Sequence, residues 1–137
     1  MRLTKVQTKV AAYNLQDVLV TLVIVGILLL LALPNLMPLI AKAKSQEAQL
    51  HLKQIYNSET TYRYMYSKYT PDMSQIDYEA PKTVNEGGTA NYVYEILSAS
   101  GNTFKARATA ITDFDGDGTF DVWEIDEQGA PKQIIKD

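Results

Sequence analysis

The sequence predicts an α+β fold, in which a long N-terminal helix, first membrane-spanning and then amphipathic, packs on a small three- to four-stranded antiparallel sheet. Three observations lead to this expectation. An apolar segment runs from Tyr13 to Pro34. Apolar residues then recur at spacings of three and four up to about Tyr69. Beyond them, β-branched and aromatic runs alternate with turn residues in the last third of the chain.

The apolar segment is long enough to enter a membrane. Val18–Leu33 contains no charge, and Thr21 is its only polar side chain. At about 1.5 Å per residue these positions span roughly 24 Å, just short of the ~30 Å hydrocarbon core of a bilayer. Continuation of the helix to residue 40 makes up the difference. We therefore expect residues 13–40 to form a hydrophobic anchor and residues 41–137 a soluble domain.

A basic leader precedes the apolar segment. Residues 1–12 contain no acid and three basic residues, which are Arg2, Lys5 and Lys9. The apolar run exceeds the usual 7–15 residues of a secretory signal, and no small-x-small cleavage site follows it. The small residues Ala11 and Ala12 lie before the run instead. Cleavage there would leave the apolar helix on the mature protein.

Asp17 is the one acid at the edge of this segment. A carboxylate costs about 2.5–3.5 kcal/mol at the centre of a membrane helix and less near its end. Two interpretations are open. Asp17 caps the helix N-terminus among the lipid headgroups, or it has a functional partner inside the membrane.

These residues resemble the N-terminus of type IV pilins and of type II secretion pseudopilins, in particular a major pseudopilin. That family has a basic leader, a small residue before the cleavage point, an aromatic mature N-terminus, a glutamate, one glycine in the apolar helix and a proline. The matching positions here are Ala12, Tyr13, Asp17, Gly26 and Pro34. Alanine replaces the usual glycine and aspartate the glutamate. The resemblance covers about the first 70 residues, and the remainder matches in layout.

The resemblance implies how the protein is processed and used. A prepilin peptidase would remove residues 1–12 between Ala12 and Tyr13, and the new N-terminus would be methylated. Asp17, Gly26 and Pro34 would serve assembly. The chain would be a structural subunit of a pseudopilus or pilus, foremost a pseudopilin of a type II secretion-like system.

The resemblance also implies location and partners. The protein would cross the inner membrane once, with its globular domain on the periplasmic side, before joining a periplasmic or surface filament. Its partners would be copies of itself, the peptidase, inner-membrane assembly platform proteins and minor pseudopilins. A membrane-tethered calcium-binding module that acts as a monomer is the alternative.

Composition narrows the remaining possibilities. The 137 residues carry a net charge of −3, and removal of the leader would make it −6, which disfavours nucleic-acid binding. The chain has no cysteine, so disulfides and thiol chemistry are excluded. Its only histidine, His51, lies among polar helical residues and is expected to be exposed. We therefore do not expect an enzyme.

The elements after the apolar segment follow from periodicity. The helix should continue to about Tyr69, with kinks at Pro34 and Pro38. Its four tyrosines are interpreted as the face on which the sheet packs: Tyr62, Tyr64, Tyr66 and Tyr69. A loop is expected over residues 70–90. Strands are expected at Tyr92–Leu97, Phe104–Ile111 and Phe120–Ile125, with a short edge strand within Pro131–Asp137.

An acidic segment in the C-terminal region matches the calcium-loop pattern. Acids occupy its positions 1, 3, 5, 9 and 12, glycine position 6, and the residue at position 7 would contribute its backbone carbonyl. The acids are Asp113, Asp115, Asp117, Asp121 and Glu124, the glycine is Gly118, and the residue at position 7 is Thr119. Calcium takes six to eight oxygen ligands, and closely spaced acids repel one another without a cation.

The residues on both sides of this segment are expected to form strands, whereas a helix-loop-helix calcium site has helices there. The alternative is a solvated polar turn, because Asp and Gly are favoured in turns. Major pseudopilins have a calcium site in the C-terminal region, but their ligand pattern differs from this one. The resemblance therefore assigns no ligands here, and calcium is expected from the acids themselves.

Overall fold

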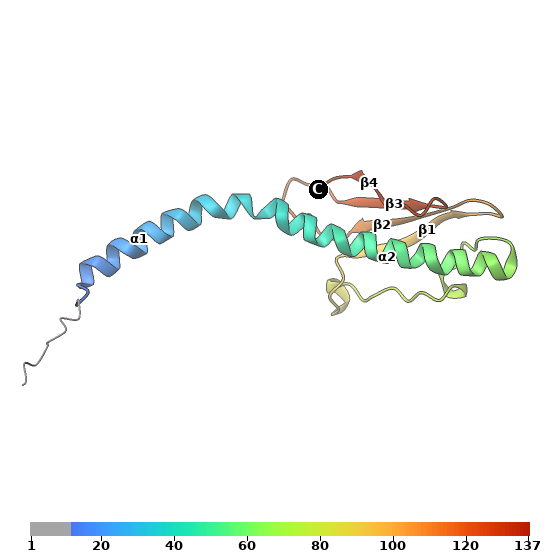
Figure 1. Cartoon of the computed structure of the whole chain (residues 1–137), viewed down its shortest axis with the longest axis horizontal. Helices are drawn as coiled ribbons and strands as arrows, with labels where there is room; N and C mark the ends of the chain where they lie inside the picture. The colour runs from blue at the N-terminus through green and yellow to red at the C-terminus, as the bar shows by residue number, and fades with distance from the viewer. Residues whose placement is uncertain (1–11) are drawn as a thin grey trace, which may run out of the picture. The chain divides into compact units, whose positions relative to one another are not determined.

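The computed structural model describes residues 12–137 of the chain (Figure 1). The leader predicted for residues 1–12 therefore lies outside the described residues, except for Ala12. The chain divides into two compact units, one ending at Leu36 and one spanning Met37–Asp137. We describe each unit by itself.

The first unit consists of helix α1 (Leu15–Ala32) and the 3-10 turn η1 (Leu33–Asn35). No residue of α1 is buried within the described chain. Together the two elements form one 21-residue apolar stretch that is long enough, by length and composition, to cross a membrane. The α-helix ends before Pro34 because proline lacks a backbone donor and clashes with the preceding turn.

The second unit begins with helix α2 (Met37–Tyr66). Its 30 residues span roughly 45 Å. Pro38 lies in the first turn of α2, where a missing N–H breaks no helical hydrogen bond. The prediction of a kink at Pro38 is therefore wrong, whereas the interruption at Pro34 is present.

Helix α2 ends three residues earlier than the sequence predicts. Ser67 adopts a left-handed conformation with φ of 60°, and its N–H donates to the carbonyl of Arg63 at 2.7 Å. The tyrosine interpretation holds for Tyr62 and Tyr69, which are buried, and is wrong for Tyr64 and Tyr66, which are exposed. Tyr64 is two residues from Tyr62, about 200° around the helix, so it points away from the core.

Four strands follow in one antiparallel sheet with the order β1-β2-β3-β4. The strands are β1 (Tyr92–Ala99), β2 (Phe104–Ala110), β3 (Val122–Asp126) and β4 (Lys132–Ile135). The predicted hairpin, third strand and edge strand are confirmed, although β3 begins two residues late. Sequential antiparallel pairing needs only short connections.

The core lies between α2 and the sheet. Strand β2 alternates, and its inward positions Ala106, Ala108 and Ala110 are small. They allow the helix to approach closely, and Leu52 and Ile55 of α2 are completely buried there. This packing confirms the predicted α+β fold.

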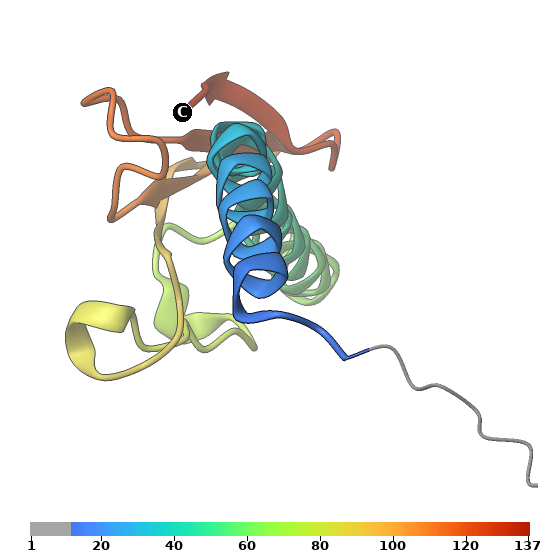
Figure 2. The same ribbon diagram turned by 90° about the vertical axis from the view of Figure 1, so that its left-hand side faces the viewer.

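The connection from α2 to β1 carries two short 3-10 turns, η2 (Met73–Gln75) and η3 (Val84–Glu86). In Figure 2 this yellow-green segment extends away from strands β3 and β4. His51 packs beneath it: its Nδ1 lies 3.3 Å from the hydroxyl of Tyr78, and its ring lies 5.1 Å from that of Tyr94. His51 is thus half-buried, and the expectation that it is exposed is wrong. The residues that cover it, Tyr78 and Tyr94, lie far from it in the sequence.

Candidate functional site

The N-terminal site is the first turn of α1. Asp17 lies at its third position, and its Oδ2 accepts a hydrogen bond from the backbone N–H of Asn14 at 3.3 Å. This contact satisfies one of the free donors at the helix start. The carboxylate therefore reaches back toward Tyr13, whose side chain is 84% exposed.

The other two assembly residues lie further along the same unit. A Cβ added at Gly26 would meet no heavy atom within 4 Å, so the fold of this unit does not require glycine there. Pro34 is the second residue of η1, where the α-helical hydrogen bonding is interrupted. Ala12 and Tyr13, the residues on either side of the expected cleavage point, are both exposed and precede the helix.

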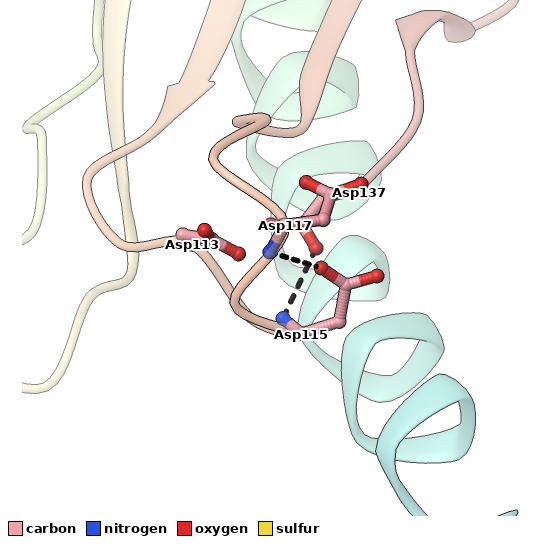
Figure 3. A group of neighbouring side chains, drawn as sticks. All are labelled: Asp113, Asp115, Asp117 and Asp137. Carbon is pink, nitrogen blue, oxygen red and sulfur yellow. Dashed lines mark hydrogen bonds between the residues drawn. The ribbon is translucent and has the colours of Figure 1, made fainter.

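The second site is the acidic loop between β2 and β3. Four carboxylates converge, and one oxygen from each lies within 4.8 Å of the others (Figure 3). They belong to Asp113, Asp115, Asp117 and Asp137. Gly116 and Gly118 have φ of 85° and 87°, a left-handed conformation that glycine adopts readily and that folds the loop tightly.

Backbone amides hold two of these carboxylates in place. The Oδ1 and Oδ2 of Asp113 accept from the N–H groups of Gly116 and Gly118, each at 2.6 Å. These bonds, that of Gly118 most of all, lower the pKa of Asp113. The carboxylate of Asp137 accepts from the N–H groups of Phe114 at 2.7 Å and Asp115 at 3.2 Å. The C-terminal segment is thereby fastened to the loop.

Asp115 shows the mutual repulsion of the group. The N–H of Asp117 stabilises its charged form, but desolvation and the charges of Asp117, Asp137 and Asp113 outweigh this and raise the pKa of Asp115. The arrangement supplies at least four hard oxygen ligands on one side of an exposed loop, the donor type that calcium prefers.

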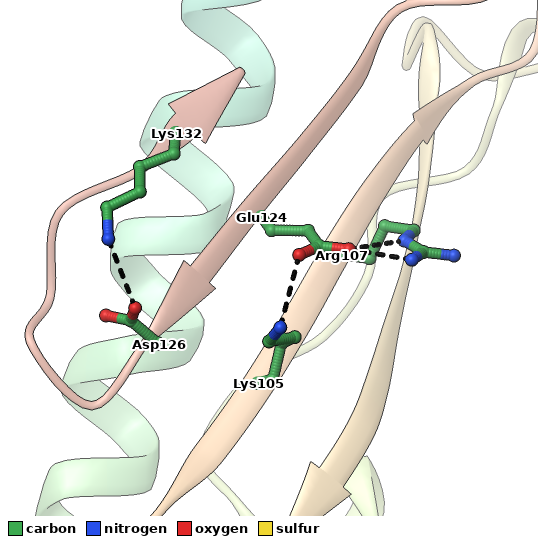
Figure 4. A network of polar contacts seen from close by, with 5 residues as sticks. All are labelled: Lys105, Arg107, Glu124, Asp126 and Lys132. Atoms are coloured by element: carbon green, nitrogen blue, oxygen red, sulfur yellow. Dashed lines mark hydrogen bonds and ion pairs between the residues drawn. The ribbon is translucent and has the colours of Figure 1, made fainter. Parts of the chain in front are cut away.

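The structure does not bring Asp121 or Glu124 to this group, so the predicted ligand set is corrected. Asp121 is buried and accepts hydrogen bonds from four side chains, among them Tyr92 and Ser45. Glu124 lies on β3 and pairs with Arg107 at 2.7 Å and with Lys105 at 3.6 Å (Figure 4).

Asp121 and Glu124 lie apart from the acidic group because the chain returns to an extended strand after the loop. The N–H of Thr119 donates to Asp117 Oδ1 at 2.7 Å, and its carbonyl stays a predicted ligand.

Sequence reasoning missed Asp137. It lies 20 residues after Asp117, and only the antiparallel pairing of β4 with β3 returns it to the loop. No local spacing in the sequence signals this contact.

Comparison with known proteins places these observations in context. No protein-family model matches the chain. It is 26% identical over 102 residues to the type IV major pilin protein PilA of Myxococcus xanthus (strain DK1622). The match covers 74% of the chain. Together with the exposed apolar α1 and the α2-on-sheet unit, this similarity supports a pilin-like family.

The chain is pilin-like in sequence and fold. The pilin-like chain spans less than half of that relative, since the match covers 44% of its length. The similarity therefore extends over only part of that pilin.

Proposed function

We propose that this chain is a structural subunit of a helical pilus or pseudopilus filament, not an enzyme, and that it is inserted in the inner membrane before assembly. The observation that carries the proposal is α1. None of its 18 residues is buried within the described chain. Such a helix is stable only in lipid or against other apolar helices, because exposed apolar patches of this size are rare on soluble monomers.

The presence of Asp17 favours a filament subunit over a plain membrane anchor. A plain anchor would gain only the capping contact with Asn14 from this acid, and a neutral glutamine would supply that contact without the cost of burying a carboxylate. After cleavage at Ala12, the new amine of Tyr13 would lie one residue before the Asn14 N–H that Asp17 already accepts. We propose that Asp17 pairs with this amine in the same or a neighbouring subunit, where a low dielectric strengthens the attraction.

Gly26 and Pro34 suit the packing of neighbouring α1 helices. The open surface at Gly26 allows a second helix to approach closely. We propose further that a prepilin peptidase and an inner-membrane assembly platform process and insert the chain, and that minor pseudopilins join it. Its soluble unit would lie on the periplasmic side.

Within this class we propose a pseudopilin of a type II secretion-like system. The cysteine-free, four-stranded sheet supports this assignment. The similarity to a major pilin supports a surface pilus instead.

The test expresses the full chain with each of two assembly systems, one for type II secretion and one for type IV pili, and images filaments by electron microscopy. Filaments with the first system support the pseudopilin, and filaments with the second alone support the pilin. A chain that stays monomeric in the membrane with both contradicts the filament proposal.

We also propose that the acidic loop binds calcium, with Asp113, Asp115, Asp117 and Asp137 as ligands and the Thr119 carbonyl as a further oxygen. The convergence of these four carboxylates favours this candidate. A cation would relieve their repulsion and would join the C-terminal segment to the loop, in a chain that has no cysteine to do so. A membrane-tethered calcium-binding monomer remains the alternative if filaments do not form.

A further inference from the structure

The second unit has an apolar, acid-rimmed groove at one end. It has a volume of about 730 Å³ and lies between the first turns of α2, the acidic loop and β4. Leu39 and Trp123 contribute apolar surface, and Leu39 is 61% exposed. The charged groups at its rim are Asp115, Asp117, Asp137, Lys42 and Lys136. We call this the basal groove, and its rim carries more negative than positive charge.

The opposite end of the unit carries an exposed apolar tip. Three consecutive residues of the last turn of α2 are Tyr64, Met65 and Tyr66, which are 86%, 65% and 60% exposed. Three consecutive residues cover about 200° of a helix, so one core cannot bury them all. Lys68 lies two residues beyond Tyr66 and takes part in none of the ion pairs of residues 12–137. We call Tyr64, Met65, Tyr66 and Lys68 the α2 tip.

The tip and the groove are at the two ends of one rigid helix. Because α2 is roughly 45 Å long, they cannot meet within one copy. Figure 1 shows the C-terminus beside the first turns of α2 and the green end of the helix at the far side of the sheet. The two patches can therefore meet each other only between copies.

We propose that the α2 tip of one copy packs into the basal groove of the next copy. The tip presents aromatic and thioether surface to Leu39 and Trp123, and in the calcium-free loop Lys68 meets the carboxylates at the groove rim. This inference rests on the proposed filament function and names the contact between its soluble units.

The contact is heterologous, because a different patch is used on each copy. Such contacts generate open helical assemblies when the rotation does not close a ring. The other occupant available from a second copy is α1. Helix α1 has no basic residue, so it would leave the excess negative charge of the groove rim unmatched.

The experiment uses paired cysteines in the full chain, which has none of its own. Lys42→Cys places a thiol at the groove and Met65→Cys places one on the tip, and both native side chains are exposed. Assembled filaments are treated with a short bis-maleimide and analysed on a denaturing gel. We expect a ladder of dimers, trimers and longer products, because each copy carries one tip and one groove.

Two matched controls accompany the pair. Met65→Cys with Glu95→Cys, an exposed position on β1, should give no ladder. Met65→Cys alone should give monomers. Dimers from this single variant would indicate tip-to-tip pairing and overturn the proposal, as would cross-linking of Lys42→Cys to Val25→Cys on α1.

Intact filaments without a ladder from the Lys42 and Met65 pair would also overturn it, while the filament function stands. Absence of filaments from the unmodified chain would instead contradict the filament function.

A second variant covers failure of the cysteine chains to assemble. Tyr64→Ala should leave the melting temperature unchanged, because the side chain is exposed, yet reduce filament yield roughly tenfold, as loss of an aromatic anchor does. A normal yield would contradict the proposal.

Discussion

The hydroxyl of Tyr92 donates a 2.6 Å hydrogen bond to the carboxylate of Asp121, and both residues are almost completely buried. Burial, followed by this hydrogen bond and the charge of Asp121, raises the pKa of Tyr92, so the hydroxyl stays a donor.

Three further donors reach the same carboxylate: the Ser45 hydroxyl at 3.0 Å, the Trp123 indole at 2.8 Å and the Gln133 amide at 2.7 Å. Asp121 therefore ties α2, β1, β3 and β4 together in a chain without disulfides.

Substitution of Asp121 by asparagine should lower the free energy of unfolding by about 3 kcal/mol. The amide would keep the shape but replace one acceptor oxygen by an NH₂ group, which would face the Gln133 amide at the Oδ1 position or the other three donors at the Oδ2 position. Buried donors without acceptors are costly, and the charge that the four donors stabilise would be lost. Denaturant unfolding of the full chain in detergent measures the change.

Asp126→Asn is the matched control, because both contacts of Asp126 are exposed: an ion pair with Lys132 at 3.3 Å and a hydrogen bond from the Gln128 N–H at 3.0 Å. Its effect should be below about 1 kcal/mol. Equal effects of the two variants would contradict the central role of Asp121.

Glu59 should make the protein less stable as the pH rises. It is completely buried, with Oε2 accepting from the Thr70 N–H at 3.1 Å and Oε1 without a partner among the described residues. Burial raises its pKa above 4.5, against the smaller opposing effect of the Thr70 bond. The folded state therefore binds more protons than the unfolded state between 4.5 and the raised pKa, and the free energy of unfolding falls through that window.

Glu59→Gln removes this titration, so the variant should gain stability relative to the native chain between about pH 4 and about pH 8. Denaturant unfolding at both pH values provides the test. Glu95→Gln, at an exposed position, should show no such gain. A native chain that becomes more stable relative to Glu59→Gln as the pH rises would refute the assignment.

Asp17→Ala should insert into the membrane normally but assemble poorly, with filament yield reduced roughly tenfold. The amine of Tyr13 would then be desolvated without a partner. Membrane fractionation and quantified filament yield separate the two steps. Asp17→Glu keeps the charge and should retain most assembly, whereas a normal yield from Asp17→Ala would exclude the pairing.

Cleavage should occur between Ala12 and Tyr13 and should leave a methylated amine on Tyr13. The motivation is a small residue beside an aromatic one, directly before an apolar helix that must be retained. Intact mass and N-terminal sequencing of protein from cells with the prepilin peptidase measure both modifications. A mature chain that starts at Met1, or anywhere after Ile40, would contradict the prediction.

Calcium should raise the melting temperature of the full chain in detergent. At a tenfold excess over Kd, binding to the folded state alone adds about 1.4 kcal/mol, or roughly 4–8 °C for a domain of about 100 residues. Thermal unfolding with calcium and with chelator measures the shift. Asp115→Ala together with Asp117→Ala should abolish it.

Two single variants distinguish the ligand sets. Asp137→Asn should weaken calcium binding, because Asp137 converges on the loop, and Glu124→Gln should leave the calcium shift unchanged, because Glu124 pairs with Arg107. The reverse result would restore the ligand set predicted from spacing. Equal melting temperatures with calcium and chelator would make the loop a solvated turn.

The local sequence pattern was sufficient to predict the helices and strands of this protein. Sixteen uncharged positions from Val18 to Leu33 define the apolar helix, and the spacing of Leu52, Ile55 and Tyr62 defines the buried face of α2. These features repeat with the period of a helix or a strand, so they are readable from neighbouring residues alone. The same reasoning recovered four strands and missed their ends by only a few residues.

Tertiary structure decided where each acidic side chain lies and which groups it contacts. Asp113 and Asp121 belong to one spacing pattern, yet Asp113 is half-buried and held by loop amides, whereas Asp121 is buried against Ser45, 76 residues earlier in the chain. Asp137 enters the acidic group only through the pairing of β4 with β3. Sequence by itself determined where helices, strands and the acidic turn lie, because those depend on local periodicity. The partner of each charge depended on which distant segments pack together, and no spacing along the chain encodes that.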